Sequence, residues 1–284
     1  MHHTMPPVEV VQLAEPVEFL ERAASILADE ARHNLILGIA ATLRDNPSLY
    51  PEHRLWLVLD GGETVAAALR TPPYNLVLGG GSHEAFDALA RAVGEIPGAV
   101  GAVPEIDVFV AAYERLHSVR REPRVEQGIY ALDAVVPAAT PLGSARAATM
   151  ADRPLLVRWW GAFGLEALGA LEQDEEQNAR SVDHRLTTPG NGIVLWEVDA
   201  DPVSLVSYGS PTPSGVRIGP VYTPAEHRGR GYASALTAHV SAEQLAAGRD
   251  FCFLYTDLAN PTSNKIYVAI GYRRVADAIQ YAFV

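Results

Sequence analysis

The chain has 284 residues, of which 48% are hydrophobic and 20% charged, and its formal net charge is −12. This composition is typical of a globular protein and not of a disordered one, and no apolar run approaches the roughly 18 residues of a membrane span. Because so acidic a surface repels phosphates, the sequence predicts no nucleic-acid partner. The lack of a long apolar run predicts that the chain does not associate with a membrane. It would attract cationic substrates such as amines, although an acidic balance is also an ordinary route to solubility.

The lone cysteine, Cys252, lies in the apolar run 251–255. One cysteine cannot form a disulfide within the chain, and the N-terminus has no basic-then-apolar signal pattern, so a cytoplasmic location is predicted. Cys252 itself is predicted to be a small buried strand residue and not a nucleophile. No histidine or cysteine cluster has metal-ligand spacing, so no metal site is predicted.

The first half alternates strand and helix signals. A strand candidate at 8–13 precedes a largely helical stretch over 15–43. The runs 55–60 and 64–69, joined by Gly61-Gly62, predict a β-hairpin. The pattern then predicts a strand at 74–78, a helix at 82–93 capped by Ser82, a strand near 99–103, a helix at 105–116 and strands around 120–132.

The stretch 137–143, with two prolines, is the predicted linker between a domain at 1–136 and a domain at 144–284. Beyond it the order of elements repeats. The pattern predicts a helix at 152–167, an acidic stretch leading to His184, a hairpin over 193–208, a strand at 216–223, a helix at 232–245, a strand at 251–256, a helix at 262–270 and a last strand ending at Val284.

Three pairs of residues hold similar places in the two predicted hairpins. They are Trp56 and Trp196, Asp60 and Asp199, and Val65 and Val203. This similarity predicts duplication of one α+β unit, with chance likeness between two hairpins as the alternative. The predicted fold class is therefore α+β (a mixed α/β sheet), in two tandem domains that are each a twisted, mostly antiparallel sheet flanked by helices.

Between the strand 216–223 and the helix that begins near Tyr232 lies the turn Arg228-Gly-Arg-Gly231. A helix start leaves backbone N–H groups unpaired and carries partial positive charge. Glycines let a ligand approach the backbone, so this turn can cradle a phosphate or pyrophosphate, with Arg228 and Arg230 adding charged contacts. The alternative is a surface turn that needs glycine for positive φ.

The pattern Arg228-x-x-Gly231-x-Ala233 resembles the acetyl-CoA pyrophosphate motif of the GNAT superfamily of N-acetyltransferases. Farther on, 260–272 is similar to the family's later helix, with its asparagine and tyrosine. The resemblance covers 145–284 well and the first half in outline. It implies two tandem GNAT-like domains and acetyl-CoA as co-substrate.

By this resemblance, strand backbone groups contact the pantetheine arm, the turn binds the pyrophosphate, and an asparagine contacts the arm. The implied cofactor-binding residues are Val221, Tyr222, Thr223, Arg228, Gly229, Arg230, Gly231, Tyr232, Ala233 and Asn264. In the first half Gly79-Gly-Gly-Ser82 stands at the place of the turn, with no basic residue beside it. There Val110 and Tyr113 stand where the second half has Asn264 and Tyr267. The first domain is therefore predicted to keep the fold without the cofactor.

Acyl transfer from a thioester to an amine needs a polarised carbonyl, a neutral amine and a proton for the leaving thiolate. The backbone N–H of Val221 is predicted to polarise the carbonyl. Pro220, just before it, cannot pair with a neighbouring strand through its own nitrogen, which is compatible with a local separation, or splaying, of the strands. The alternative is an edge strand that an ordinary proline interrupts. Tyr267, whose phenol has an unperturbed pKa of about 10, is predicted to supply the proton, as the family's tyrosine does. A half-buried packing residue is the alternative.

The strand 216–223 holds no carboxylate, so the general base stays open. The candidates are Glu197, Glu172, Glu175, Glu176 and Asp183, each with a solvated surface charge as the alternative. Asn260 is predicted to cap the last helix, with Pro261 at its first position.

The predicted activity is an N-acyltransferase that moves an acetyl group from acetyl-CoA to a primary amine, of a small molecule or a peptide, by direct attack. The alternative is a non-catalytic CoA-binding or regulatory module. The amine, the acyl chain and the oligomeric state, a homodimer included, are left open.

Overall fold

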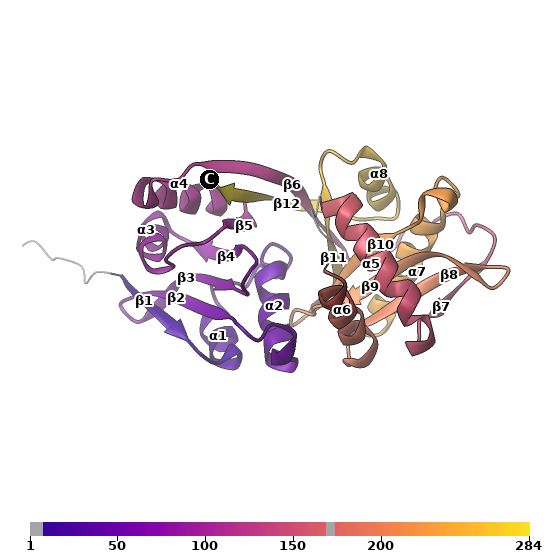
Figure 1. Cartoon of the computed structure of the whole chain (residues 1–284), viewed down its shortest axis with the longest axis horizontal. Coiled ribbons are helices and arrows are strands. Elements are labelled where there is room, and N and C mark those ends of the chain that lie inside the picture. The colour runs from indigo at the N-terminus through magenta and orange to yellow at the C-terminus, as the bar shows by residue number, and fades with distance from the viewer. Residues whose placement is uncertain (1–7, 169–173) are drawn as a thin grey trace, which may run out of the picture. The chain divides into compact units, whose positions relative to one another are not determined.

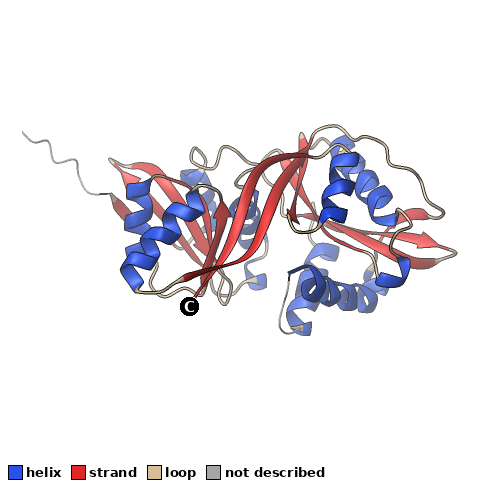
Figure 2. Ribbon diagram, turned by 90° about the horizontal axis from the view of Figure 1, so that it is seen from above, coloured by secondary structure: helices blue, strands red, loops and turns tan. Residues whose placement is uncertain are grey.

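The structure is a computed structural model of the chain, and it describes residues 8–168 and 174–284 (Figure 1). It divides into two compact units. Unit 1 comprises the chain up to Gly128 together with Ala276–Val284, and unit 2 comprises Ile129–Val275. Figure 2 shows helices on both faces of the strands of each unit. Both units have the predicted α+β architecture.

Unit 1 contains strands in the order β1-β2-β3-β4-β5-β12-β6. The strands are β1 (Glu9–Leu13), β2 (Arg54–Asp60), β3 (Glu63–Arg70), β4 (Leu76–Gly81), β5 (Gly98–Ala102), the larger part of β6 (Arg121–Leu132) and that of β12 (Arg273–Phe283). The helices are α1 (Pro16–Ala23), α2 (Asn34–Asp45), α3 (His83–Ala92) and α4 (Glu105–His117), with a 3-10 turn η1 (Pro47–Leu49).

The central strands of unit 1 are buried on both faces. Trp56 and Val58 of β2 pack in a core with α3 and α4, whereas Leu55 and Leu57 pack in a second core with α1 and α2. Successive side chains of a strand point to opposite faces, so a strand between two helical layers is apolar at every position. This accounts for the unbroken apolar run at 55–59.

Unit 2 contains strands in the order β6-β11-β10-β9-β8-β7, where β6 contributes its end. The strands are β7 (Ser144–Ala147), β8 (Gly192–Val198), β9 (Asp201–Gly209), β10 (Gly215–Tyr222) and β11 (Phe251–Asp257). The helices are α5 (Arg153–Leu168), α6 (Glu175–Thr187), α7 (Tyr232–Ala246) and α8 (Pro261–Ala269), with 3-10 turns η2 (Met150–Asp152) and η3 (Ala225–His227). Residues of α7 and α8 form one core with the sheet, and residues of α5 and α6 form another.

The path of the chain differs from the predicted division at 136 and 144. The chain passes from unit 1 to unit 2 within β6 and returns within β12. The last residues therefore belong to unit 1, where Tyr281 of β12 pairs with Ala99 of β5. The stretch 137–143 lacks regular secondary structure but lies inside unit 2, where Trp196 Nε1 donates to Leu142 O at 3.0 Å. Local sequence patterns do not reveal which sheet a terminal strand joins.

Most other predicted elements are confirmed, with three differences. Helix α6 lies where only an acidic stretch leading to His184 was predicted, the strands at 120–132 are the single strand β6, and β7 was not predicted. Ser82 caps α3 as expected, because its hydroxyl accepts from Ala85 N at 3.3 Å.

The two hairpins agree only in part with the proposed pairs. Val65 and Val203 each stand third in the strand after the turn. Trp56 lies farther from its turn than Trp196 does, and Asp60 ends a strand whereas Asp199 lies in a turn at φ 51°. Those two pairs are therefore not equivalent.

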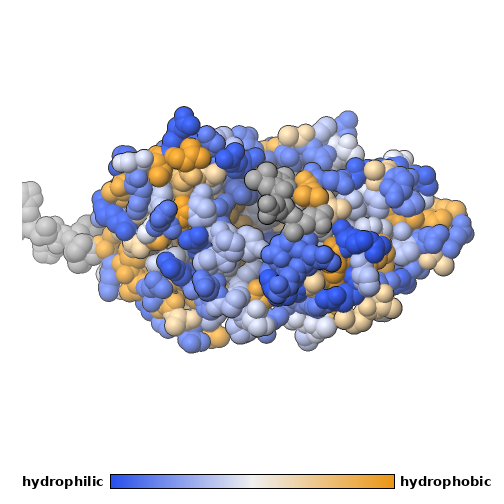
Figure 3. All heavy atoms as spheres, viewed as in Figure 1, coloured by the Kyte–Doolittle hydropathy of each residue, from blue (hydrophilic) through white to orange (hydrophobic). Residues whose placement is uncertain are grey.

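Hydrophilic residues cover most of the face shown in Figure 3, with apolar residues scattered among them. Among the helices of the described residues, none has the length and apolar character to cross a membrane.

Candidate functional site

The C-terminal end of β10 carries the first candidate residues. Its parallel pairing with β11 covers Gly215–Arg217, while its pairing with β9 continues to Tyr222. The register with β9 shifts between Ile218 and Val221, around Pro220. Since β10 lies between β9 and β11, the alternative of an edge strand broken by proline is wrong. The end of β10 extends beyond its pairing with β11, as the splaying interpretation expected.

Val221 and Tyr222 present their side chains to opposite faces of the sheet. Val221 is half buried and packs against the core that contains Tyr232 and Tyr267. Tyr222 is buried in the core formed with α5 and α6, with its ring 6.1 Å from that of Trp159. The structure therefore brings Val221, Tyr232 and Tyr267 into one core and places the Tyr222 side chain on the other face.

Ser204 of the neighbouring strand β9 holds the end of β10 through its side chain. This fully buried hydroxyl donates to Tyr222 O at 3.1 Å and lies 2.9 Å from Thr223 Oγ1. The Thr223 side chain is thus engaged inside the protein. Only its backbone is suited to contact a ligand.

The glycine turn is open. Gly229 and Gly231 have φ of 73° and 83°, a region that other residues rarely adopt, and none of the described residues has an atom within 4 Å of a Cβ built on either. Gly231 is the N-cap of α7 and supplies no side-chain cap. Within the described residues, the amides of Tyr232 and Ala233 have no hydrogen-bond partner. Such a helix start is suited to an anion.

The two arginines of the turn are held by contacts inside unit 2. Arg228 Nε donates to Thr223 O at 2.8 Å, and its Nη2 forms an ion pair with Glu166 of α5. Arg230 Nη2 donates to Glu226 O at 3.1 Å. Both guanidiniums therefore lie beside the turn, as predicted, but Arg228 already has an anionic partner.

Sequence analysis missed Glu166. Its second oxygen accepts from the Tyr222 hydroxyl at 2.9 Å. The hydrogen bond from Arg228 lowers the pKa of the Glu166 carboxyl, and the one from Tyr222 acts in the same direction. No local pattern connects Glu166 with Arg228, because only the tertiary fold brings α5 to the glycine turn.

Helix α8 carries the second motif. Asn260 Oδ1 accepts from Ser263 N at 3.1 Å with Pro261 in the first turn, which confirms the predicted cap. Asn264 Nδ2 donates to Asp257 O at 3.2 Å and to Leu258 O at 3.3 Å. Its Oδ1 is buried and has no partner within the part of the chain that the structure describes. Asn264 therefore anchors the end of β11 and retains one unused acceptor.

Tyr267 is 8% exposed, and its ring meets that of Tyr272 edge-on at 6.0 Å. Burial raises the pKa of Tyr267 to about 12, above the value assumed from the sequence. Among the described residues its hydroxyl has no hydrogen-bond partner. Tyr272, by comparison, has its hydroxyl 2.8 Å from Ser241 Oγ. Tyr267 is thus a neutral phenol whose ring packs in the core and whose hydroxyl has no hydrogen-bond partner among the described residues.

The proposed general bases have contacts of their own where the structure describes them. Three of them form ion pairs, which are Glu197 with Arg146 at 2.6 Å, Asp183 with Arg153 at 2.5 Å and Glu176 with Arg180 at 2.5 Å. Glu175 is exposed in the first turn of α6, and Glu172 lies outside the described residues. Their contacts fit the surface-charge alternative.

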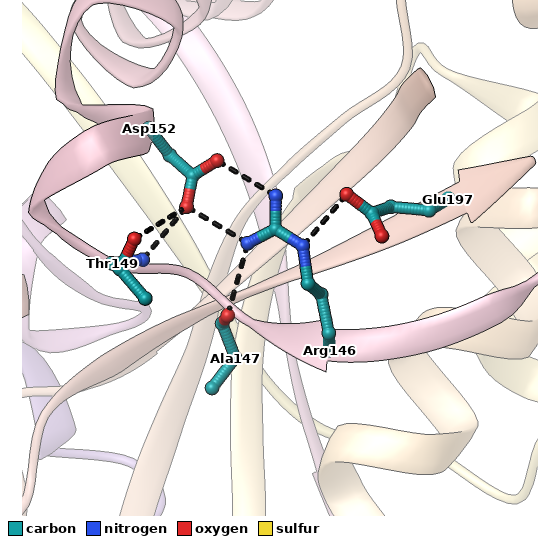
Figure 4. A network of polar contacts seen from close by, with 5 residues as sticks. All are labelled: Arg146, Ala147, Thr149, Asp152 and Glu197. Carbon is teal, nitrogen blue, oxygen red and sulfur yellow. Dashed lines mark hydrogen bonds and ion pairs between the residues drawn. The ribbon is translucent and has the colours of Figure 1, made fainter. Parts of the chain in front are cut away.

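Figure 4 shows that Arg146 lies between Glu197 and Asp152. Its guanidinium donates to Glu197 Oε1 at 2.6 Å and to the two Asp152 oxygens at 2.7 and 2.8 Å. The hydrogen bonds from Arg146 lower the pKa of Asp152 to about 2. This network ties β7 and β8 to η2, so Glu197 serves the fold.

Two further features of unit 2 are not part of the candidate site. Cys252 is fully buried and burial raises its pKa to about 12, which confirms a strand residue with an unreactive thiol. A hollow of about 390 Å³ contains none of the predicted site residues, and its lining includes Arg146, Arg185, Gly192, Tyr208, His239 and Glu243. In the described ranges there is no cluster of side chains that could hold a metal ion.

A family model described as FR47-like protein matches residues 198–281, which contain β10, the glycine turn, α7 and α8. A search of curated proteins found no match.

Similar solved structures extend over both units. An acetyltransferase of the GNAT family from Colwellia psychrerythraea is 12% identical, with coverage of 97% of this chain and 100% of that one, at a TM-score of 0.59. A GCN5-related N-acetyltransferase from Sphaerobacter thermophilus is 17% identical, with coverage of 98% and 96% and a TM-score of 0.60. A tandem GNAT protein from the clavulanic acid biosynthesis pathway is 14% identical, with coverage of 96% and 97% and a TM-score of 0.61.

At these identities the likeness concerns the fold, which is a tandem GNAT fold across the described chain. The family-model match lies on the motif-bearing elements of unit 2. The resemblance to the GNAT superfamily found in the sequence is therefore supported by the fold and by the match of residues 198–281 to the FR47-like family model.

Proposed function

We propose that unit 2 binds acetyl-CoA and transfers its acetyl group to a primary amine by direct attack. The observation that carries this proposal is the open glycine turn at the uncapped start of α7, next to a strand end that extends beyond its parallel neighbour. Backbone amides at a helix start bind phosphate oxygens without help from side chains. Arg228 and Arg230 add positive charge at the same place.

Unit 2 also offers groups for the rest of the donor. The buried Oδ1 of Asn264 is an acceptor without a partner among the described residues, and a pantetheine amide N–H would satisfy it. The backbone of Val221–Thr223 is the proposed partner of the same arm. These are the residues implied by the superfamily resemblance, and their contacts support that assignment.

The proposed reaction needs no covalent intermediate on the protein. The amine nitrogen attacks the thioester carbon, the carbonyl oxygen gains negative charge, and the C–S bond then breaks to release CoA thiolate. We assign the Val221 N–H to the developing oxyanion, where a fixed donor stabilises the transition state most. The amine nitrogen loses one proton and the CoA sulfur gains one, so the products are an amide and free CoA thiol.

Tyr267 is the proposed donor to the leaving sulfur. Because burial raises its pKa to about 12, the phenol keeps its proton at neutral pH and cannot act as a base. Full proton transfer to a thiolate is less favourable from this phenol than from one with an ordinary pKa. A hydrogen bond to the departing sulfur is therefore its main contribution, and the proton released by the amine completes the balance.

The amine enters neutral or loses its proton to water, because the described carboxylates among the suggested bases are held in ion pairs or lie at the surface. A cytoplasmic location and the absence of nucleic-acid and membrane partners stay predictions from the sequence, and the identity of the amine and the oligomeric state stay open.

Incubation with acetyl-CoA and a panel of small and peptide amines, with measurement of free thiol, tests the proposal. Thiol release that depends on one class of primary amine supports it. CoA binding in a titration without thiol release from any amine would favour the alternative, a CoA-binding or regulatory module.

A further inference from the structure

Arg228, the side chain proposed for the pyrophosphate, is already paired with a carboxylate of the protein. Its guanidinium forms an ion pair with Glu166 at the end of α5, donates to Thr223 O and lies 5.9 Å from the centre of the Tyr222 ring. Resting on the proposed function, we propose that Glu166 competes with the CoA pyrophosphate for Arg228. Cofactor binding then exchanges a carboxylate for a phosphate and releases the end of α5.

Glu166 is oriented for this contact from two directions. One carboxylate oxygen meets Arg228, and the other accepts from the Tyr222 hydroxyl at 2.9 Å. Tyr222 is 9% exposed and fixed in the core with α5 and α6, so its hydroxyl is a stationary donor. Such a two-point contact distinguishes Glu166 from a carboxylate that meets an arginine by chance at the surface.

The site becomes crowded with negative charge when an anion arrives. Glu166 already occupies Arg228, and a pyrophosphate at the turn would stand beside this carboxylate as well as beside Glu226 of η3. Like charges at hydrogen-bonding distance repel each other. The guanidinium binds carboxylate and phosphate through the same planar set of donors, so the two anions compete for it.

The contact is weak enough to be exchanged. The side chains of Arg228 and Glu166 are 49% and 47% exposed, and ion pairs at such positions contribute little to stability. The released carboxylate can turn into water without a buried charge being left behind. Glu166 therefore lowers the affinity for CoA by a modest factor and does not block the site.

The release also connects two parts of unit 2. Tyr222 joins the end of β10 to α5, since its backbone belongs to the strand and its hydroxyl holds Glu166. When Glu166 loses its contact with Arg228, the hydrogen bond from the Tyr222 hydroxyl is its remaining contact of the two. Cofactor binding at the turn is therefore communicated to the end of α5 on the other face of the sheet.

Calorimetric titration of the full chain tests the competition, with CoA and with pantetheine, which lacks the pyrophosphate. Glu166→Gln removes the charge and keeps the shape, and we expect it to tighten CoA by about two- to fivefold, the range of an exposed ion pair. Tyr222→Phe should tighten CoA by a smaller factor, because it only loosens Glu166. Binding of pantetheine should be the same in Glu166→Gln as in the unmodified chain.

Two controls separate this proposal from the proposed function. Glu176→Gln removes another exposed helical ion pair, that with Arg180, and should leave CoA binding unchanged. In an Arg228→Ala background, Glu166→Gln should have a clearly smaller effect, because the competition for the guanidinium is gone and only the direct charge repulsion remains. If CoA binds and Arg228→Ala weakens it, but Glu166→Gln leaves the affinity unchanged or lower, the competition is overturned and the proposed function stands. If no variant binds CoA, both are overturned.

Discussion

The strand-to-helix connections of the two units differ in whether the start of the helix is open to a cofactor or capped by the protein itself. In unit 2, β10 leads through the open turn to α7, whose N-cap Gly231 offers no side chain to the first amides. In unit 1, β4 leads directly to α3, and Ser82 caps this helix through its own hydroxyl. A serine cap satisfies the amide that a phosphate would use. The helix start of unit 1 is therefore already occupied by the protein.

The glycines of the two connections serve different purposes. A Cβ at Gly80 would lie 2.8 Å from Ile26 O, and one at Gly81 would lie 2.5 Å from the Phe86 ring. A Cβ at Gly229 or Gly231 of unit 2 would have no atom of the described residues within 4 Å. Unit 1 thus uses glycine so that its own chain can approach β4, whereas unit 2 uses it at a place that is open to a ligand.

An arginine and a glutamate form a pair in each unit, with different consequences. In unit 1, Arg32 donates to Val103 O at 2.5 Å and pairs with Glu105, and both side chains are about one-fifth exposed. This pair ties the segment before α2 to the end of β5 and the start of α4. The Arg228–Glu166 pair of unit 2 is about half exposed. The Arg32–Glu105 pair therefore holds elements of unit 1 together, whereas in the Arg228–Glu166 pair the carboxylate can be replaced by a ligand phosphate.

The corresponding tyrosines differ in the same way. The Tyr113 hydroxyl accepts from Ile96 N at 3.1 Å and donates to Gly94 O at 2.9 Å, so it has a structural role. The Tyr267 hydroxyl has no such partners among the described residues. The prediction that unit 1 kept the fold without the cofactor agrees with each of these differences.

The largest expected effect is on turnover, when Tyr267 of unit 2 and Tyr113 of unit 1 are each replaced by phenylalanine. Tyr267→Phe should lower turnover by about 10²–10³-fold, the usual cost of removing one positioned hydrogen-bond donor from a transition state, with little change in CoA affinity. Tyr113→Phe should cost stability and leave turnover of the folded protein unchanged. The measurement is the rate of thiol release at saturating acetyl-CoA.

The pH dependence of turnover sharpens this prediction. With a raised pKa of about 12, the Tyr267 phenol is protonated throughout the neutral and mildly alkaline range and loses its proton only near that value. Its ionisation should therefore cause no fall in turnover up to about pH 10, where a phenol with an ordinary pKa would be half ionised. Wild-type turnover in Tyr267→Phe, with chemistry rate-limiting, would reduce Tyr267 to packing.

A smaller effect is expected from the two arginines. Arg228→Ala should weaken CoA binding by about 1.5–3 kcal/mol, the range for hydrogen bonds to charged groups. The expected value is near the lower end, because Glu166 already competes for the guanidinium. Arg32→Ala in unit 1 should destabilise the protein without changing the CoA affinity. Equal losses of CoA affinity in both variants, measured by calorimetry below the unfolding temperature, would mean that the units do not differ as described.

How much the sequence revealed depended on whether the decisive residues lie close together in the chain. The glycine turn before α7 and the cap at Asn260 are local features, and both elements of structure were predicted at the correct positions. The partner of Arg228 was missed because Glu166 is 62 residues away, on a helix whose pattern shows only an exposed polar position. No spacing rule connects two such elements.

Two other differences have tertiary causes. Most of β12 joins the sheet of unit 1 because it pairs with β5, and a hydrophobic pattern does not show which strand edge is free for such pairing. The sequence analysis therefore placed this last strand in the second domain. The raised pKa of Tyr267 comes from burial in the core, which a residue name does not show. The glycines at 79–81 and at 229 and 231 look alike in the sequence, and only the surrounding atoms separate a packed turn from an open one.

Hydrogen–deuterium exchange of the full chain, with and without CoA, tests the central claim most directly. The amides that begin α7 have no partners in the described protein and should exchange quickly until CoA protects them. We predict that CoA slows exchange in peptides covering 221–234 and leaves peptides covering 79–86 of unit 1 unchanged. Protection of 79–86, or none at 221–234 with CoA bound, would contradict the assignment of a single cofactor site to the open turn of unit 2.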